Sequence, residues 1–70
     1  MTLKEAEVGI EYQVKSIETN DEELNTFLFS LGCYEGETIT IIRILRGGFV
    51  VAIKDARYTI DKNLAEAIIV

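Results

Sequence analysis

The sequence has 70 residues, 49% of them hydrophobic, and this length excludes a second domain because each half would fall below the roughly 40 residues that fold unaided. It contains no histidine and a single cysteine, Cys33, which excludes an internal disulfide, a Ser–His–Asp triad and the usual zinc ligand sets. The net charge of −5, without proline or low-complexity tracts, predicts one ordered, acidic domain over residues 1–70.

The charge is divided unevenly between the two halves of the chain. Residues 1–37 contain two lysines and nine carboxylates, whereas residues 38–70 contain five basic and three acidic side chains. Two interpretations follow: the halves pair with each other inside one fold, or they form a bipolar surface that orients a partner. We favour internal pairing, because surface ion pairs of this kind are common.

The N-terminal residues lack the apolar stretch and the small-residue cleavage site of a signal peptide. The longest apolar runs, such as residues 49–53, have the length of a strand and cannot span a bilayer. We therefore expect a cytoplasmic protein that does not insert into a membrane.

The first regular element is expected at residues 11–18. Tyr12 and Val14 alternate as in a half-buried strand, whereas Ile17 is out of phase with them. This change of phase predicts a bulge or a bend in the strand, which small barrels need.

A helix is predicted over residues 21–31, where apolar side chains recur at helical spacing and should face the core: Leu24, Phe27, Leu28 and Leu31. Asn20 is the expected N-cap, with Glu23 three residues later. Gly32 is the expected left-handed residue that ends the helix. Phe29 lies off the apolar stripe, so it is either exposed together with Tyr34 or covered by a second layer, and the pattern favours neither.

The remaining elements are short strands separated by turns. Residues 37–46 and 49–54 are rich in β-branched side chains and flank Gly47-Gly48, which predicts a hairpin. A turn at residues 54–57 leads into a strand at 58–60, and Asp61 should cap a helical turn near 61–66. Residues 67–70 form a last strand that is expected to close the sheet. About five strands with one helix predict a mainly β, partly open barrel of the SH3-like or OB type.

No catalytic or metal-binding group of residues is apparent, so we expect no enzyme activity, no metal site and no cofactor. Cys33 follows a helix C-terminus, which favours a neutral thiol and the role of a small buried hydrophobic residue. Nucleic-acid binding is an alternative, since basic side chains lie near Phe49 and Tyr58 in the sequence: Arg43, Arg46, Lys54 and Arg57. The acidic first half disfavours it, because carboxylates repel phosphates.

Four short motifs, taken in order, resemble the FeoA family over the whole chain. They are Leu3-x-x-Ala6-x-x-Gly9, then Leu28-x-x-Leu31-Gly32-x-x-x-Gly36 before a β-branched strand, then Gly48, then Leu64-Ala65-x-x-Ile68-x-Val70. The matching residues have structural roles in turns, caps and close packing: Gly9, Leu31, Gly32, Gly36, Gly48 and Ala65.

The resemblance implies an SH3-like barrel that assists FeoB, a membrane transporter for ferrous iron with a GTP-hydrolysing cytoplasmic domain. It also implies similarity to the C-terminal domain of DtxR-type metal-dependent repressors. We expect a non-enzymatic module that docks on the G domain of FeoB, with Phe29, Cys33 and Tyr34 as contacts. An alternative is a GTPase regulator in which Arg46 reaches the nucleotide site. The oligomeric state is left open.

Overall fold

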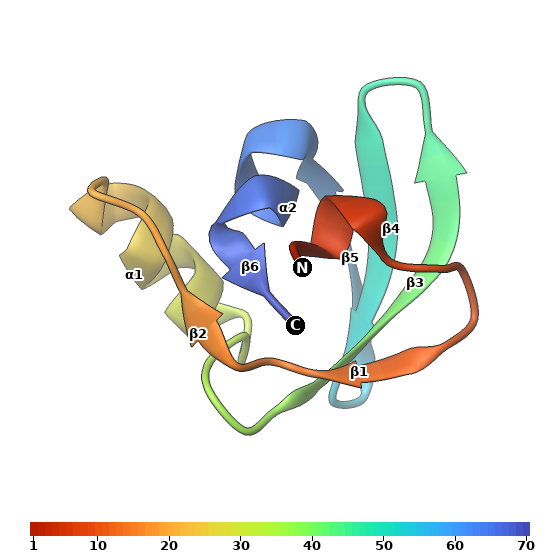
Figure 1. The fold of residues 1–70 in the computed structure, drawn as a ribbon, viewed down its shortest axis with the longest axis horizontal. Coiled ribbons are helices and arrows are strands. Elements are labelled where there is room, and N and C mark those ends of the chain that lie inside the picture. The colour runs from red at the N-terminus through yellow and green to blue at the C-terminus, as the bar shows by residue number, and fades with distance from the viewer.

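The computed structural model describes residues 1–70, and Figure 1 shows their arrangement. The elements in chain order are a 3-10 turn η1 (Leu3–Glu5), β1 (Glu11–Gln13), β2 (Ser16–Ile17), α1 (Glu22–Ser30), β3 (Thr38–Leu45), β4 (Gly48–Ile53), β5 (Ala56–Asp61), α2 (Lys62–Ala67) and β6 (Ile68–Ile69). None of the helices is long and apolar enough to cross a bilayer.

The predicted hairpin is the centre of a four-stranded antiparallel sheet with the strand order β1-β3-β4-β5. β3 and β4 pair from Ile39↔Ile53 to Leu45↔Gly48, and the pairing shifts by one residue at Ile42. Such a bulge increases the local twist, and a twisted sheet can wrap around a small core. The mainly β, SH3-like architecture expected from the sequence is therefore confirmed.

The chain breaks the predicted 11–18 strand into two strands that belong to different sheets. The Val14 N–H donates to the Glu37 carbonyl at 2.8 Å, whereas the next N–H, that of Lys15, donates to the Ile69 carbonyl at 2.7 Å. The predicted bend is confirmed, and it raises the number of strands from about five to six.

The last strand does not close the four-stranded sheet, so that part of the sequence prediction is wrong. Ile68 and Ile69 pair instead with β2, in a separate two-stranded antiparallel ribbon. The short helix α2 lies between β5 and β6 and carries the chain away from β5, so β5 stays an edge strand.

Helix α1 begins one residue later than predicted, and its N-cap is Asp21 rather than Asn20. The Asp21 carboxylate accepts hydrogen bonds from the N–H groups of Glu23 and Leu24, at 3.0 and 3.2 Å. The Asp21 N–H itself donates to the Thr19 hydroxyl, which turns the chain just before the helix. Both residue types are good caps, and an ionised carboxylate also interacts favourably with the helix dipole.

The apolar stripe of α1 is only partly covered, which corrects the expectation that all four side chains face the core. Leu28 is completely buried, and Leu24 and Leu31 are partly buried against the core. Phe27 remains 46% exposed. The reason is visible in Figure 1, where α1 lies at one side of the molecule and only one edge of it approaches the rest.

The helical turn after β5 is confirmed, with bounds of 62–67 in place of 61–66. The Asp61 carboxylate accepts a hydrogen bond from the Leu64 N–H at 2.8 Å, as a capping residue does. Ala65 is fully buried, so its small side chain lets α2 pack closely on the sheet and on η1.

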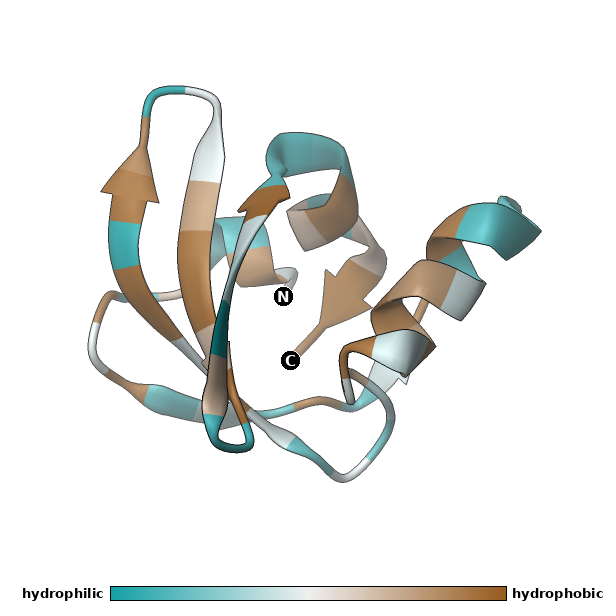
Figure 2. Ribbon diagram, turned by 180° about the vertical axis from the view of Figure 1, so that it is seen from behind, coloured by the Kyte–Doolittle hydropathy of each residue, from teal (hydrophilic) through white to brown (hydrophobic).

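The core lies between the sheet, the ribbon and the short helices, and consists of 15 buried apolar residues. Figure 2 shows the hydrophobic segments of β3, β4 and β6 lining this interior. The five strands predicted from the sequence supply ten of these residues, and Leu3 of η1 is added from a segment for which no helix was predicted.

Pairing between the acidic and basic halves is sparse. Lys54 pairs with Glu37 at 3.4 Å, and Lys4 pairs with Glu66 at 3.1 Å. Only the Lys54–Glu37 pair joins a basic residue of the C-terminal half to an acidic residue of the N-terminal half. The expected internal neutralisation is thus limited to one contact, and the other basic side chains of residues 38–70 form no ion pair.

Candidate functional site

The candidate site is a surface cluster of three side chains, Phe29, Tyr34 and Lys54, which we call the aromatic surface. Phe29 is 65% exposed, the largest fraction among the large apolar residues of the chain. Its ring centroid lies 5.0 Å from that of Tyr34, with the ring planes tilted by 34°. This offset geometry is one that aromatic pairs favour. Of the two interpretations left open by the sequence, exposure of Phe29 is the one that the structure confirms.

Lys54 also contacts the Tyr34 side chain. Its Nζ donates to the Tyr34 hydroxyl at 3.2 Å and lies 5.4 Å from the centre of the ring. The same ammonium group pairs with Glu37. The hydrogen bond to Tyr34 and the negative charge of Glu37 raise the pKa of Lys54 above its ordinary value. A charged ammonium group therefore lies beside the Tyr34 ring, which in turn packs against Phe29.

The end of helix α1 determines which side chains reach this surface. The Gly32 N–H donates to the Phe29 carbonyl at 3.0 Å, and the Cys33 N–H donates to the Leu28 carbonyl at 2.9 Å. These two bonds, with Gly32 at φ +87°, form a Schellman motif. The reversal turns Cys33 into the core next to Leu28 and leaves Tyr34 at the surface, beside Phe29.

The β4–β5 turn supplies Lys54, which sequence reasoning did not place at this site. Ile53 pairs with Ala56, so the turn has only two residues, and Lys54 adopts φ +56°. A left-handed non-glycine residue is uncommon, and here it directs the lysine across the sheet end to Tyr34. The sequence predicts a turn at residues 54–57, which the structure shortens to 54–55, but the contact of Lys54 with Tyr34, 20 residues earlier in the chain, has no signal in the sequence.

Cys33 is in the core, where 1% of it is exposed. Burial raises the pKa of its thiol to about 11, since the thiolate would lose its hydration. The predicted neutral, buried thiol agrees with this placement. A side chain in this position does not reach the surface to touch a partner, so we do not include Cys33 in the aromatic surface.

Arg46 is exposed in the β3–β4 turn, which Figure 1 places at the opposite end of the hairpin from the loop that holds Tyr34. The structure thus does not bring Arg46 together with Phe29 and Tyr34. Phe49 is buried, so the basic and aromatic residues considered for nucleic-acid binding do not form one platform on which bases could stack.

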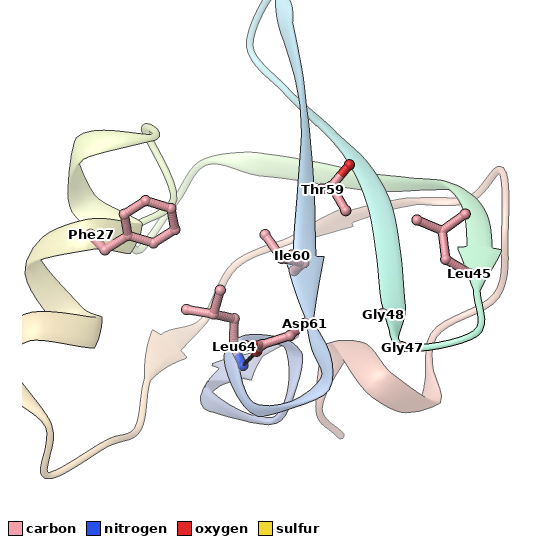
Figure 3. A pocket seen from close by; sticks show the side chains of 8 residues that line it. All are labelled: Phe27, Leu45, Gly47, Gly48, Thr59, Ile60, Asp61 and Leu64. Atoms are coloured by element: carbon pink, nitrogen blue, oxygen red, sulfur yellow. Dashed lines mark hydrogen bonds between the residues drawn. The ribbon is translucent and has the colours of Figure 1, made fainter.

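A second feature is a groove of about 410 Å³ that crosses the end of β5, from the β3–β4 turn to α1, as shown in Figure 3. Phe27 of α1 faces Ile60 and Leu64 across it, and Gly48 lies at its other end. Gly48 must lack a side chain because a Cβ atom there would clash with the Ile60 carbonyl oxygen. Phe27 has the spacing of a core residue, so the sequence did not indicate this groove.

No group of three or more histidine, cysteine, aspartate or glutamate side chains is close enough to hold a metal ion. The remaining motif glycines have backbone roles: Gly9 and Gly36 both adopt positive φ in turns. The residues that carry the resemblance thus shape loops and packing, and the exposed chemistry lies in the aromatic surface and along β5.

The fold and the two exposed features place this protein in a class, that of small SH3-like domains with surfaces for contact. A family model described as the FeoA domain matches residues 1–70. The chain therefore belongs to the FeoA family, and it is a non-catalytic accessory protein of ferrous iron transport. A comparison with curated proteins found no match.

Solved structures agree with this assignment. A crystal structure of an iron uptake regulatory protein, FeoA, is 25% identical, with a TM-score of 0.86 over 97% of this chain and 91% of the other. FeoA of Stenotrophomonas maltophilia, a prokaryotic SH3 domain protein complexed with zinc, is 19% identical, with a TM-score of 0.87 over 99% and 87%. A manganese-dependent transcriptional repressor is 23% identical, with a TM-score of 0.85 over 97% of this chain and 39% of the repressor. The last two share the fold.

Proposed function

We propose that this protein is a cytoplasmic docking module that binds the G domain of a FeoB-type ferrous iron transporter through its aromatic surface. The observation that carries the proposal is the exposure of Phe29 next to Tyr34 and Lys54. Membership of the FeoA family supports the choice of partner, because it links the chain to ferrous iron transport.

The chemistry of the aromatic surface suits protein recognition. Aromatic side chains contribute large contact areas with few rotatable bonds, and they are common among the residues that dominate binding energy. The tilted ring pair and the contact of the Lys54 ammonium group with Tyr34 restrict the motion of these side chains before binding. A preformed surface loses less conformational entropy when it binds.

A role for Arg46 at the nucleotide site of the transporter remains a separate prediction, since its turn lies away from the aromatic surface. It is tested by single-turnover GTP hydrolysis in the presence of wild-type protein or Arg46→Ala. A regulator that acts through this arginine would accelerate hydrolysis only when the arginine is present. A docking module would give equal rates with both proteins.

The docking proposal is tested by calorimetric titration of the isolated FeoB G domain with Phe29→Ala and Ile44→Ala. Ile44 is a matched control, because it is 63% exposed but lies in β3. We expect Phe29→Ala to weaken binding about 30-fold, the effect of losing a contact worth about 2 kcal/mol, and Ile44→Ala to bind like the wild type. Equal affinities for both variants would overturn the assignment of the surface.

A further inference from the structure

The outer edge of β5 has no partner in the fold. β5 is the last strand of the four-stranded sheet, and no backbone hydrogen bond outside the regular elements involves residues 56–60. Ile53 pairs with Ala56 across a two-residue turn, so these two residues form a hydrogen-bonded pair. In an antiparallel ladder every second residue forms such a pair, so the backbone N–H and C=O groups of Tyr58 and Ile60 also point toward β4. The backbone N–H groups of Arg57, Thr59 and Asp61 therefore point away from β4.

This edge lacks two of the features by which proteins usually prevent strands from pairing with other chains, a proline and a bulge, and its two charged side chains, Arg57 and Asp61, have opposite signs. β5 is six residues long, contains no proline and pairs with β4 without a register shift. The groove bordered by Phe27 and Leu64 reaches β5 at Thr59, Ile60 and Asp61 (Figure 3). An additional strand would extend the sheet there.

We propose that the occupant is a second copy of this chain, whose β5 pairs antiparallel with β5 so that Thr59 lies opposite Thr59 on a two-fold axis. In this register Arg57 lies opposite Asp61 of the second copy, and the same pair forms again across the axis. All three residues have exposed side chains on one face of the sheet. Opposite charges and threonine pairs are favourable across antiparallel strands.

The other face of the same register adds apolar contact mainly through Tyr58. Tyr58 is partly buried and lies opposite Ile60 of the second copy, but Ile60 is only 2% exposed and already packs in its own core. The exposed face is therefore the one that is complementary to itself, at Arg57, Thr59 and Asp61, which favours a second copy over an unrelated peptide.

The charge and size of the interface limit its strength. Each chain carries a net charge of −5, so two copies repel each other at long range. A single pair of six-residue strands belongs to the small, transient class of interfaces, below about 1,200 Å² in total. We therefore expect a weak dimer that dissociates on dilution.

The test is a dilution series followed by amide NMR spectra and translational diffusion. We expect shifts of residues 57–61 and slower diffusion as the concentration rises. Arg57→Glu places like charges opposite each other twice, and should weaken the dimer about tenfold. Arg43→Glu is the matched control, since it changes the net charge equally on an exposed residue of β3, two strands away from the edge. It should leave the dimer intact.

Thr59→Pro gives a second, independent variant. Proline removes an N–H group that has no partner in the monomer, so an edge strand tolerates it, but the bond at the two-fold axis is lost. We expect this variant to remain monomeric at all concentrations. Spectra of the wild-type protein that do not change on dilution would overturn the proposal. So would concentration-dependent shifts away from β5, or a dimer that Arg57→Glu weakens no more than Arg43→Glu does.

Discussion

At the scale of single residues, Gly32 connects the helix end to the aromatic surface. Its φ of +87° allows the reversal that separates Cys33 from Tyr34. A Cβ atom at this position would also lie 2.9 Å from Cε of Lys54. Gly32 is therefore needed for two reasons: it permits the turn, and it leaves room for Lys54, which donates a hydrogen bond to Tyr34.

Gly32→Ala should lower the free energy of unfolding by about 1–2 kcal/mol, the cost of a left-handed conformation for a residue with a Cβ atom. Gly47→Ala is the control, because Gly47 has no positive φ and nothing lies within 4 Å of a Cβ placed there. Urea denaturation measures both. Equal stabilities of the two variants would show that neither the backbone conformation nor the contact with Lys54 matters.

Cys33 predicts a specific dependence of stability on pH. The pKa of its thiol is about 11 in the folded protein, whereas the ordinary value, which applies to the unfolded chain, is 9.0. Between pH 9 and pH 11 it is therefore mainly the unfolded chain that loses the proton. Below pH 9 both states are neutral and the group has no effect on the pH dependence. As the pH rises from 9 to 11, the free energy of unfolding should fall by about 2 kcal/mol, because the full slope of about 1.36 kcal/mol per pH unit is reached only between the two pKa values.

This loss is measured by urea denaturation at several alkaline pH values for the wild type and for Cys33→Ala. Other groups that titrate in this range, Lys54 among them, are present in both proteins and cancel in the comparison. The alanine variant should be less stable at neutral pH because it leaves a small cavity. Its stability should decline less steeply above pH 9, and parallel curves for the two proteins would contradict the burial of the thiol.

At the scale of elements, the caps of α1 test where the helix begins. Asp21→Ala should cost about 1 kcal/mol of unfolding free energy, because two N–H groups lose their acceptor. Asn20→Ala should change the stability by less than about 0.5 kcal/mol, as expected for a surface residue outside the cap. Thermal unfolding of the two variants distinguishes them, and the reverse order would restore Asn20 as the N-cap.

The elements that the sequence predicts well are those whose signals are local. The hairpin at Gly47-Gly48, the helix end at Gly32 and the cap at Asp61 depend on contacts within a few residues, and all three occur in the structure. The strand over residues 11–18 has a local signal for its bend, the phase of Ile17. Its division between two sheets depends on Ile69, more than 50 residues later, for which periodicity carries no information.

The same limit explains the errors at the candidate site. Phe27 has the spacing of a core residue, yet it is exposed because α1 contacts the rest of the molecule along only part of its stripe. Lys54 reaches Tyr34 through a contact between two loops that are distant in the sequence. Phe29 and Tyr34 were predictable, since one lies off the stripe and the other follows the helix end.

At the scale of the whole molecule, the fold separates two exposed features that carry different proposals. The aromatic surface lies at the end of α1 and at the β4–β5 turn, and the free edge runs along β5 beside Phe27 and Leu64. Docking on the transporter concerns the first, and association of two copies concerns the second. Because the variants Phe29→Ala and Arg57→Glu lie in different features, each should affect one kind of binding and leave the other unchanged.

The central claim, docking through the aromatic surface, is tested most directly by amide NMR spectra of this protein during titration with the FeoB G domain. We predict that the largest shifts fall on residues 29–34 and on Lys54, whereas Arg46 and its turn stay unchanged. The absence of any shift at saturating G domain, or shifts confined to residues far from Phe29 and Tyr34, would contradict the account.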